Sequence, residues 1–375
     1  MFTSLCIVFA VSFCVSTLVC WFVKRWANTV GLIDKPGERK IHQTPVPTAG
    51  GLGIWLGILL PVTVVTGLLL LCQQSDAVKN LLPESIAQYI DGAFYRSGQL
   101  WLLIGLGSVL VLLGILDDKY NLNWKLRICV QFLLATAAVC AGWRFTIFLD
   151  LPIFTAVLSV FWIVGLVNAF NMLDNMNGLS AGVALVCTLF LATVMFLSPN
   201  AESREPQYFI AALLLMLAGA IAGFMVHNNP WRGSLFMGDC GAYFIGFLLA
   251  TLTLTATFAT YQGDGESTGG RQTIFVPLMI LAVPLYDMMT VILIRLRHGK
   301  SPFVGDKNHF SHRLVDLGLS KPYAVLTIYL TTMICGIGAL LLYCVPFYGA
   351  VLLFTQTVLT LLLIAVIEHT GRKRE

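Results

Sequence analysis

The sequence predicts an all-α, polytopic integral membrane protein with about eleven transmembrane helices. Of its 375 residues, 57% are apolar and only 11% are charged, whereas soluble proteins carry about 25% charged residues. The apolar residues are also grouped into runs of roughly 20, which is the length that crosses a bilayer as a helix. These observations exclude a soluble enzyme, a disordered protein and a nucleic-acid-binding protein.

The first apolar run, residues 2–23, is expected to be a retained membrane span. It lacks the basic amino-terminal region and the small-residue cleavage site of a secretory signal, and Lys24 and Arg25 follow it. Pro277 and Pro284 interrupt the ninth run and predict a kink there. The ten runs expected to follow the first are 50–72, 100–116, 128–142, 151–167, 180–197, 208–226, 242–260, 274–294, 323–344 and 346–367.

The distribution of Lys and Arg predicts an external amino terminus and a cytoplasmic carboxyl terminus. In that orientation 18 of the 23 Lys and Arg residues lie inside, and cytoplasmic loops of membrane proteins are enriched in both residue types. We expect a single transmembrane domain over residues 1–375. Its inner segments would be 24–49, 117–127, 168–179, 227–241 and 295–322, together with the tail from residue 368.

Polar residues concentrate in these five inner loops, which could therefore converge on one site. The first loop contains Arg39, Lys40 and His42, and Gly50 and Gly51 follow it. The cations would suit phosphate contacts at the membrane surface. A positively charged anchor that only sets the orientation has the same composition, so charge alone leaves both interpretations open.

The second loop begins with the adjacent acids Asp117 and Asp118, and Lys125 follows them. Two neighbouring carboxylates at the membrane surface, with cations close by, suit divalent-metal or phosphoryl chemistry. A solvated helix end is an equally good interpretation at this point.

The third loop contains no Lys or Arg, but Asn168, Asn171 and Asp174 recur in it at intervals of three residues. On a helix these three side chains lie along one side. Amide and carboxylate oxygens are hard ligands for Mg²⁺ and hydrogen-bonding partners for a nucleotide base. A polar packing seam between helices is the alternative.

In the fourth loop Gly238 and Gly241 flank Asp239, and glycine allows the close approach of a ligand. The fifth loop contains Asp306, His309, His312 and Arg313 among six Lys and Arg residues, and Asp287 precedes it. Two His residues three positions apart could bind a metal. The surrounding cations favour an anion such as pyrophosphate instead.

In this order the five clusters resemble the polyprenyl-phosphate N-acetylhexosamine-1-phosphate transferase family, whose members start lipid-linked glycan assembly in membranes. The resemblance covers residues 31–319. Two departures concern Asn177, where bacterial members usually carry an acid, and Ser311, which replaces the middle residue of a His-x-His-His motif. The shared motifs are Arg-Lys-x-His and Gly-Gly (Arg39, Lys40, His42, Gly50, Gly51), Asp-Asp (Asp117, Asp118), Asn-x-x-Asn-x-x-Asp (Asn168, Asn171, Asp174), Met-Gly-Asp (Asp239) and the basic His loop.

The resemblance implies transfer of N-acetylglucosamine-1-phosphate from UDP-N-acetylglucosamine to undecaprenyl phosphate, with release of UMP, at the cytoplasmic face of a bacterial inner membrane. It implies Mg²⁺, with Mn²⁺ as an alternative, held by Asp239 and Asn171. The residues that it implies as catalytic are Asp117, Asp118, His309 and His312. Those that it implies for substrate binding are Lys40, His42, Lys125, Asp174, Asn177, Asp306 and Arg313.

Two other activities stay open. Within the family, phospho-N-acetylmuramoyl-pentapeptide transferases resemble one another in a His-rich loop that continues into an acidic Phe-Glu stretch, whereas Arg313-Leu-Val-Asp-Leu-Gly follows His312 here. We therefore expect the smaller donor. From another class, a transporter or flippase would place ionisable residues near the bilayer midplane, where Asp287 is the one exception to an apolar interior. The oligomeric state, including a homodimer, is open as well.

Overall fold

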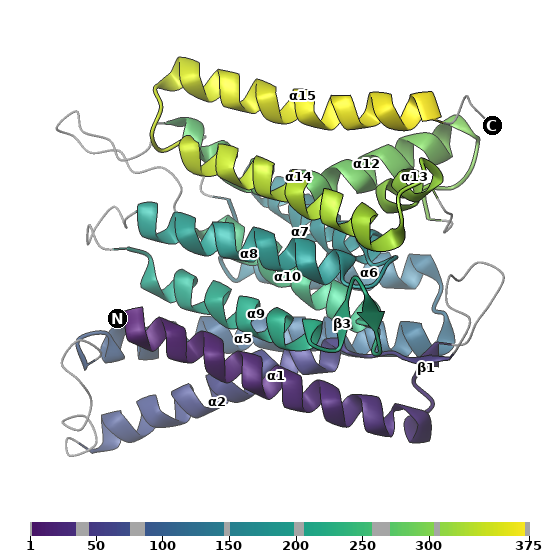
Figure 1. Cartoon of the computed structure of the whole chain (residues 1–375). Coiled ribbons are helices and arrows are strands. Elements are labelled where there is room, and N and C mark those ends of the chain that lie inside the picture. The colour runs from purple at the N-terminus through teal and green to yellow at the C-terminus, as the bar shows by residue number, and fades with distance from the viewer. Residues whose placement is uncertain are drawn as a thin grey trace.

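The computed structural model describes residues 2–34, 45–75, 87–145, 151–198, 206–256, 271–303 and 308–371. The long helices lie side by side in one bundle (Figure 1), which confirms the all-α class. The helices are α1 (Phe2–Val30), α2 (Gly51–Gln74), α5 (Ile90–Tyr120), α6 (Trp124–Cys140), α7 (Pro152–Leu173), α8 (Leu179–Leu197), α9 (Tyr208–Met225), α10 (Gly238–Thr255), η1 (Arg271–Phe275), α11 (Val276–Ile280), α12 (Ala282–Arg297), α13 (Phe310–Asp316), α14 (Lys321–Leu341) and α15 (Phe347–Gly371).

Within these residues, nine helices are long and apolar enough to cross a membrane, and a bent pair of helices would add a tenth. The remaining predicted run corresponds to α6, which has 17 residues. A polytopic membrane protein is thus confirmed, while the count of eleven spans stays a prediction.

The bent pair lies where the sequence predicts a kink. The helical segments on either side of Leu281 meet at 66°. Pro284 follows three residues later, and proline both lacks an amide hydrogen for the carbonyl four residues earlier and clashes with that carbonyl. The bend at Leu281 therefore lies in the turn whose backbone hydrogen bonding Pro284 disrupts.

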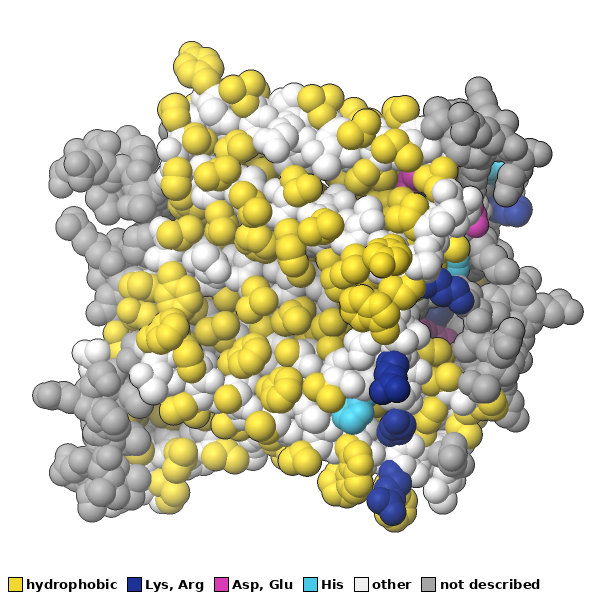
Figure 2. Space-filling view, in the orientation of Figure 1, with side chains coloured by type: hydrophobic (Ala, Val, Ile, Leu, Met, Phe, Trp, Pro, Cys, Tyr) yellow, Lys and Arg dark blue, Asp and Glu magenta, His cyan; other side chains and the backbone are white. Residues whose placement is uncertain are grey.

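The two ends of the bundle differ in charge. Figure 2 shows an apolar belt across the middle, while the visible charged and His side chains gather at the end where α13 lies. Two short antiparallel pairs lie at that end as well, β1 (Ile33–Asp34) with β2 (Val46–Pro47) and β3 (Asn228–Asn229) with β4 (Arg232–Gly233). The start of α1 and the end of α15 lie at opposite ends of the bundle (Figure 1), as an odd number of crossings requires. Which end faces the cytoplasm stays a prediction.

Small residues bring α1 and α9 into backbone contact. A Cβ atom at Gly219 or Gly223 would overlap the carbonyl oxygens of Phe9 and Phe13, and Ser16 Oγ donates to the carbonyl oxygen of Ala220 at 2.7 Å. Packing through small residues is how helices associate where water supplies no hydrophobic driving force.

Helix α10 is the central helix of the bundle, and every residue from Cys240 to Leu254 is buried. Its first turn carries Asp239. The acid is thus placed at the charged end of the molecule on the helix with the most covered surface.

Candidate active site

Two helices approach the first turn of α10 through glycines. A Cβ atom at Gly51 in α2 would overlap the backbone of Gly241. One at Gly114 in α5 would overlap Cys240 and lie 2.6 Å from the carbonyl carbon of Asp239. Because only glycine permits backbones to come this close, Asp239 is brought up to the residues that end α5.

The close approach of α5 to α10 brings the carboxylate of Asp118 to the backbone of Asp239. Asp118 Oδ1 accepts the backbone amide of Asp239 at 3.4 Å, and its Oδ2 accepts Thr48 Oγ1 at 3.5 Å. Gly238 has φ +74°, and a side chain there would strike Asp118 Oδ2. The glycine before Asp239 therefore permits both the left-handed backbone and the contact between the two acids.

Asp117 is held from three directions. Leu122 donates its backbone amide to Oδ1 at 2.9 Å, while Arg127 Nη1 and the Tyr243 hydroxyl donate to Oδ2 at 2.5 Å and 3.1 Å. The same Arg127 nitrogen lies 3.7 Å from Asp239 Oδ2. A carboxylate that is 5% exposed and bound by three donors is suited to orienting Arg127 and poorly suited to being a nucleophile.

The two asparagines near the end of α7, Asn168 and Asn171, contact different parts of the protein. Asn171 Nδ2 donates to Asp239 Oδ1 at 2.7 Å, so this residue reaches the acidic cluster. One turn earlier Asn168 Nδ2 donates to Gln131 Oε1 at 2.6 Å, a polar contact between α7 and α6. The ligand interpretation thus suits Asn171, whereas the packing-seam interpretation describes Asn168.

Asp174 caps the carboxyl end of α7 and is partly buried. Burial, and then the negative charge of Asp118, raise the pKa of its carboxyl to about 8. This interaction indicates that Asp174 shares an electrostatic environment with the acids at the end of α5.

The turn after Asp174 rests on the β3–β4 hairpin. Gly178 has φ +72°, and its backbone amide donates to Asn228 Oδ1 at 2.5 Å. The Asn228 amide in turn donates to the carbonyl oxygen of Leu235 at 2.7 Å. Gly233 lies directly against the side chain of Asn177, so the hairpin fixes the position of that amide.

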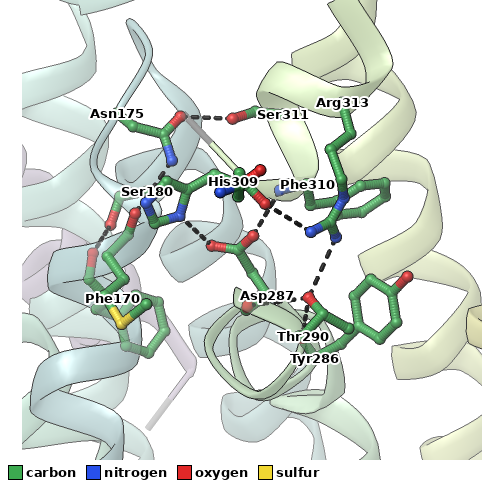
Figure 3. Close-up of polar contacts among 12 residues, drawn as sticks. Phe170, Asn175, Ser180, Tyr286, Asp287, Thr290, His309, Phe310, Ser311 and Arg313 are labelled. Atoms are coloured by element: carbon green, nitrogen blue, oxygen red, sulfur yellow. Dashed lines mark hydrogen bonds and ion pairs between the residues drawn. The ribbon is translucent and has the colours of Figure 1, made fainter. Parts of the chain in front are cut away.

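The part of the fifth loop that carries His309 and His312, residues 308–313 and called the His loop from here on, is anchored on Asp287. This acid is completely buried in α12 (Figure 3). Its Oδ2 lies 3.0 Å from Nδ1 of His309, and its Oδ1 accepts the backbone amide of Phe310 at 2.6 Å. The rings of His309 and His312 have their centroids 6.4 Å apart. With Nδ1 occupied, Nε2 is the nitrogen of His309 that a substrate could contact.

The His loop also contacts the turn after α7. Ser311 is buried and its Oγ donates to Asn175 Oδ1 at 2.5 Å (Figure 3). The segment after α12 contacts the start of α6 instead, where the rings of Phe303 and Trp124 stack with centroids 4.1 Å apart. Ser311 therefore has a structural contact at the position where the family pattern carries a third His.

The donor chemistry of the acidic cluster fits Mg²⁺. Asp118, Asp239 and Asn171 offer the carboxylate and amide oxygens that this ion prefers, and the mutual repulsion of the carboxylates would be relieved by a cation. Among the described residues, His, Cys, Asp and Glu side chains do not form a group of three around one point. A bound ion would therefore complete its shell with Asn171, water and substrate phosphates, as Mg²⁺ commonly does.

Comparison with known proteins identifies the family. The sequence profile of glycosyl transferase family 4 matches residues 100–257. A decaprenyl-phosphate N-acetylglucosaminephosphotransferase of Mycobacterium tuberculosis (strain ATCC 25618 / H37Rv) is 30% identical over 332 residues, which cover 84% of this chain and 77% of that protein. The chain belongs to glycosyl transferase family 4.

Two further relatives align with this chain over most of its length. The "Probable undecaprenyl-phosphate N-acetylglucosaminyl 1-phosphate transferase" of Bacillus subtilis (strain 168) is 29% identical, with 98% of this chain and 93% of that protein covered. The undecaprenyl-phosphate alpha-N-acetylglucosaminyl 1-phosphate transferase of Escherichia coli (strain K12) is 27% identical, with coverages of 88% and 81%. The family predicted from the five motifs is confirmed.

The residues predicted to bind substrate in this family 4 chain differ from one another in exposure. Lys125 is exposed, and its Nζ lies 5.8 Å from the centre of the Trp124 ring. Arg313 is buried and contacts other protein groups. Lys40, His42 and Asp306 lie outside the described residues. All the catalytic, metal and substrate roles stay predictions.

Sequence analysis did not single out two residues that contact the acids of the site, Tyr243 and Arg127. Tyr243 lies four residues after Asp239, so both side chains share one face of α10, and that spacing was the available signal. Arg127 is one of several cations in the second loop, and nothing in its sequence context separates it from Lys125. Its contact with Asp117 depends on the turn between α5 and α6.

Proposed function

We propose that this family 4 protein transfers N-acetylglucosamine-1-phosphate from UDP-N-acetylglucosamine to undecaprenyl phosphate and releases UMP. The observation that carries the proposal is the contact between Asp118, Asp239 and Asn171 at the charged end of an apolar helical bundle. A soluble nucleotide sugar and a membrane-anchored phosphate can meet there. The names of the relatives agree with undecaprenyl phosphate as the acceptor and N-acetylglucosamine 1-phosphate as the transferred group.

Asp239, Asp118 and Asn171 would hold Mg²⁺, which when bound neutralises negative charge on the donor pyrophosphate. Arg127 lies beside Asp239 and Asp117 and adds a fixed positive charge. Asp117 keeps that guanidinium in place. Cations placed where charge develops are the main requirement of phosphoryl transfer.

The lipid phosphate acts as the nucleophile in this proposal. One of its oxygens forms a bond to the phosphorus next to the sugar, the bond between that phosphorus and the bridging oxygen breaks, and UMP leaves. A phosphate monoester has its second pKa near 6 and is mostly dianionic at pH 7. No strong protein base is therefore required, which agrees with the engaged carboxylate of Asp117.

The His loop would contact the diphosphate. Asp287 fixes the orientation of the His309 ring, so that its second nitrogen can face a substrate oxygen, and His312 lies beside it. We place this end of the bundle on the cytoplasmic side because Lys and Arg concentrate there, and we place the protein in a bacterial inner membrane because the relatives are bacterial.

The proposal is tested with purified protein, undecaprenyl phosphate and either of two donors. UDP-N-acetylglucosamine should give UMP and a lipid-linked product, Mg²⁺ should be required, and UDP-N-acetylmuramoyl-pentapeptide should give neither product. Use of the pentapeptide donor alone would assign the alternative activity of the family. Movement of a lipid-linked sugar across proteoliposomes without UMP release would indicate a transporter.

A further inference from the structure

Helix α13 carries His312, and His309 is its amino-terminal cap, yet the helix has only seven residues, Phe310–Asp316. A helix this short is not stable by itself in water. The groups that hold it therefore determine where the two imidazoles lie. Its first turn is held by Asp287 and by the contact between Ser311 and Asn175 (Figure 3).

The next turn of α13 is held by the last helix of the bundle. Nε of Arg313 lies 3.0 Å from Oε2 of Glu368 in α15, and both side chains are less than one-tenth exposed. The Tyr286 hydroxyl donates to the same carboxylate oxygen at 3.1 Å. Nη1 and Nη2 of Arg313 donate to the Asn308 carbonyl oxygen at 2.6 Å and to Thr290 Oγ1 at 3.1 Å.

Nη1 and Nη2 of Arg313 thus donate hydrogen bonds, while Nε is in ion-pair contact with Glu368 without a hydrogen bond of its own. The contact with Asn308 lies at the start of the His loop, and that with Thr290 lies on α12, one turn after Asp287. Arg313 thus joins α12, α13 and α15 at one point, and Glu368 is its charge partner.

Glu368 is unusual in its own helix. The rest of α15 presents large apolar side chains outward, among them Leu352, Leu359 and Leu363, and the helix lies at the edge of the bundle (Figure 1). An acid buried near the end of such a helix is costly unless it is paired. Membrane anchoring requires only the apolar face, so it does not explain the acid.

We propose that Glu368 is a positioning residue for the transferase site, which acts through Arg313 to hold α13 and thereby His309 and His312. Its effect on catalysis rests on the proposed function. The last helix then contributes to the active site without touching the substrates, and Arg313 acts through the protein framework.

The kinetic test compares Glu368→Ala, Glu368→Gln and Glu368→Asp with Gln356→Ala, which changes an exposed polar residue of the same helix. Misplacing groups by about 1 Å can lower the rate of an enzyme about a hundredfold. We expect kcat to fall by about 10- to 100-fold in the Ala and Gln variants, to recover partly in the Asp variant, and to stay at the parental value in Gln356→Ala. In an Arg313→Met background, Glu368→Ala should cause little further loss, because the link is already broken.

A second measurement does not depend on activity. Hydrogen exchange in detergent should be faster for peptides covering residues 308–319 in Glu368→Gln than in the parent, and unchanged for peptides of α10. Parental kcat and parental exchange in Glu368→Gln, or additive losses in the double variant, would overturn the proposal. If the parent transfers no sugar phosphate, the proposed function fails, while the exchange result still decides whether Glu368 holds α13.

Discussion

Substitution of Gly114 by Ala should disable the site although it adds only one methyl group. Gly114 lies in the interior of α5, where alanine is the better helix former by roughly 1 kcal/mol. Any loss must therefore come from packing against α10. The added Cβ atom would overlap Cys240 and lie 2.6 Å from the carbonyl carbon of Asp239.

The size of the displacement follows from these contacts. Carbon atoms in ordinary contact are about 3.5 Å apart, so the backbone at Asp239 must move by roughly 0.9 Å or more. The acid would then leave its contacts with Asp118 and Asn171. A shift of about 1 Å can cost about a hundredfold in rate, and overpacking costs about 1–3 kcal/mol of stability.

Gly105→Ala is the matched control, because it lies in the same helix with nothing within 4 Å of the added atom. Both variants are purified in detergent, their melting temperatures are measured, and UMP release is followed at saturating substrates. We expect kcat to fall about a hundredfold in Gly114→Ala and to be unchanged in Gly105→Ala. Parental turnover in Gly114→Ala would show that contact between α5 and α10 does not position Asp239.

Three further predictions concern charge, orientation and pH. Asp239→Asn should lower kcat more than a hundredfold, because it removes charge at a phosphoryl-transfer site, whereas Asp91→Asn, an exposed acid near the start of α5, should not; similar rates would contradict the role of Asp239. In a background depleted of its own Cys residues, a Cys at Tyr95 should be labelled from outside the cell, and a Cys at Trp231 only after permeabilisation, since both positions are exposed; the reverse pattern would reject the orientation. The pKa of Asp174 is raised from 3.8 to about 8 in the folded protein, which means that folding favours the neutral acid. The stability that the neutral Asp174 contributes therefore declines above pH 3.8 and is lost above about pH 8. The melting temperature of the ligand-free protein should therefore fall over this range less steeply in Asp174→Asn than in the parent, and identical slopes would refute the shift.

Hydropathy predicted the positions of the helices but not their full lengths. The run at 100–116 lies inside α5, which extends from Ile90 to Tyr120. A bilayer requires about 20 apolar residues, so hydropathy marks the part of a helix that lies among lipids. Backbone hydrogen bonding continues through the polar residues beyond it, and for this reason Asp117 and Asp118 are helical residues.

The site could be predicted where spacing along one helix was sufficient. Asn171 lies near the acids, as expected from its interval to Asp174, but its contact with Asp239 depends on the packing of α7 against α10. The partner of Asn168 is Gln131 in another helix. Contacts between helices depend on their relative rotation, and a single sequence carries little information about that rotation.

Arg313 and Glu368 show what sequence charge leaves out. In the sequence Arg313 is a cation beside two His residues, which favours a phosphate contact, and Glu368 begins what looks like a solvated tail. In the structure both are buried and paired. A charged side chain is stable in a protein interior only when an opposite charge or several hydrogen-bond donors or acceptors face it, so the two residues require each other. Neither could be assigned alone, because burial is a property of the assembled bundle and the two residues lie on different helices.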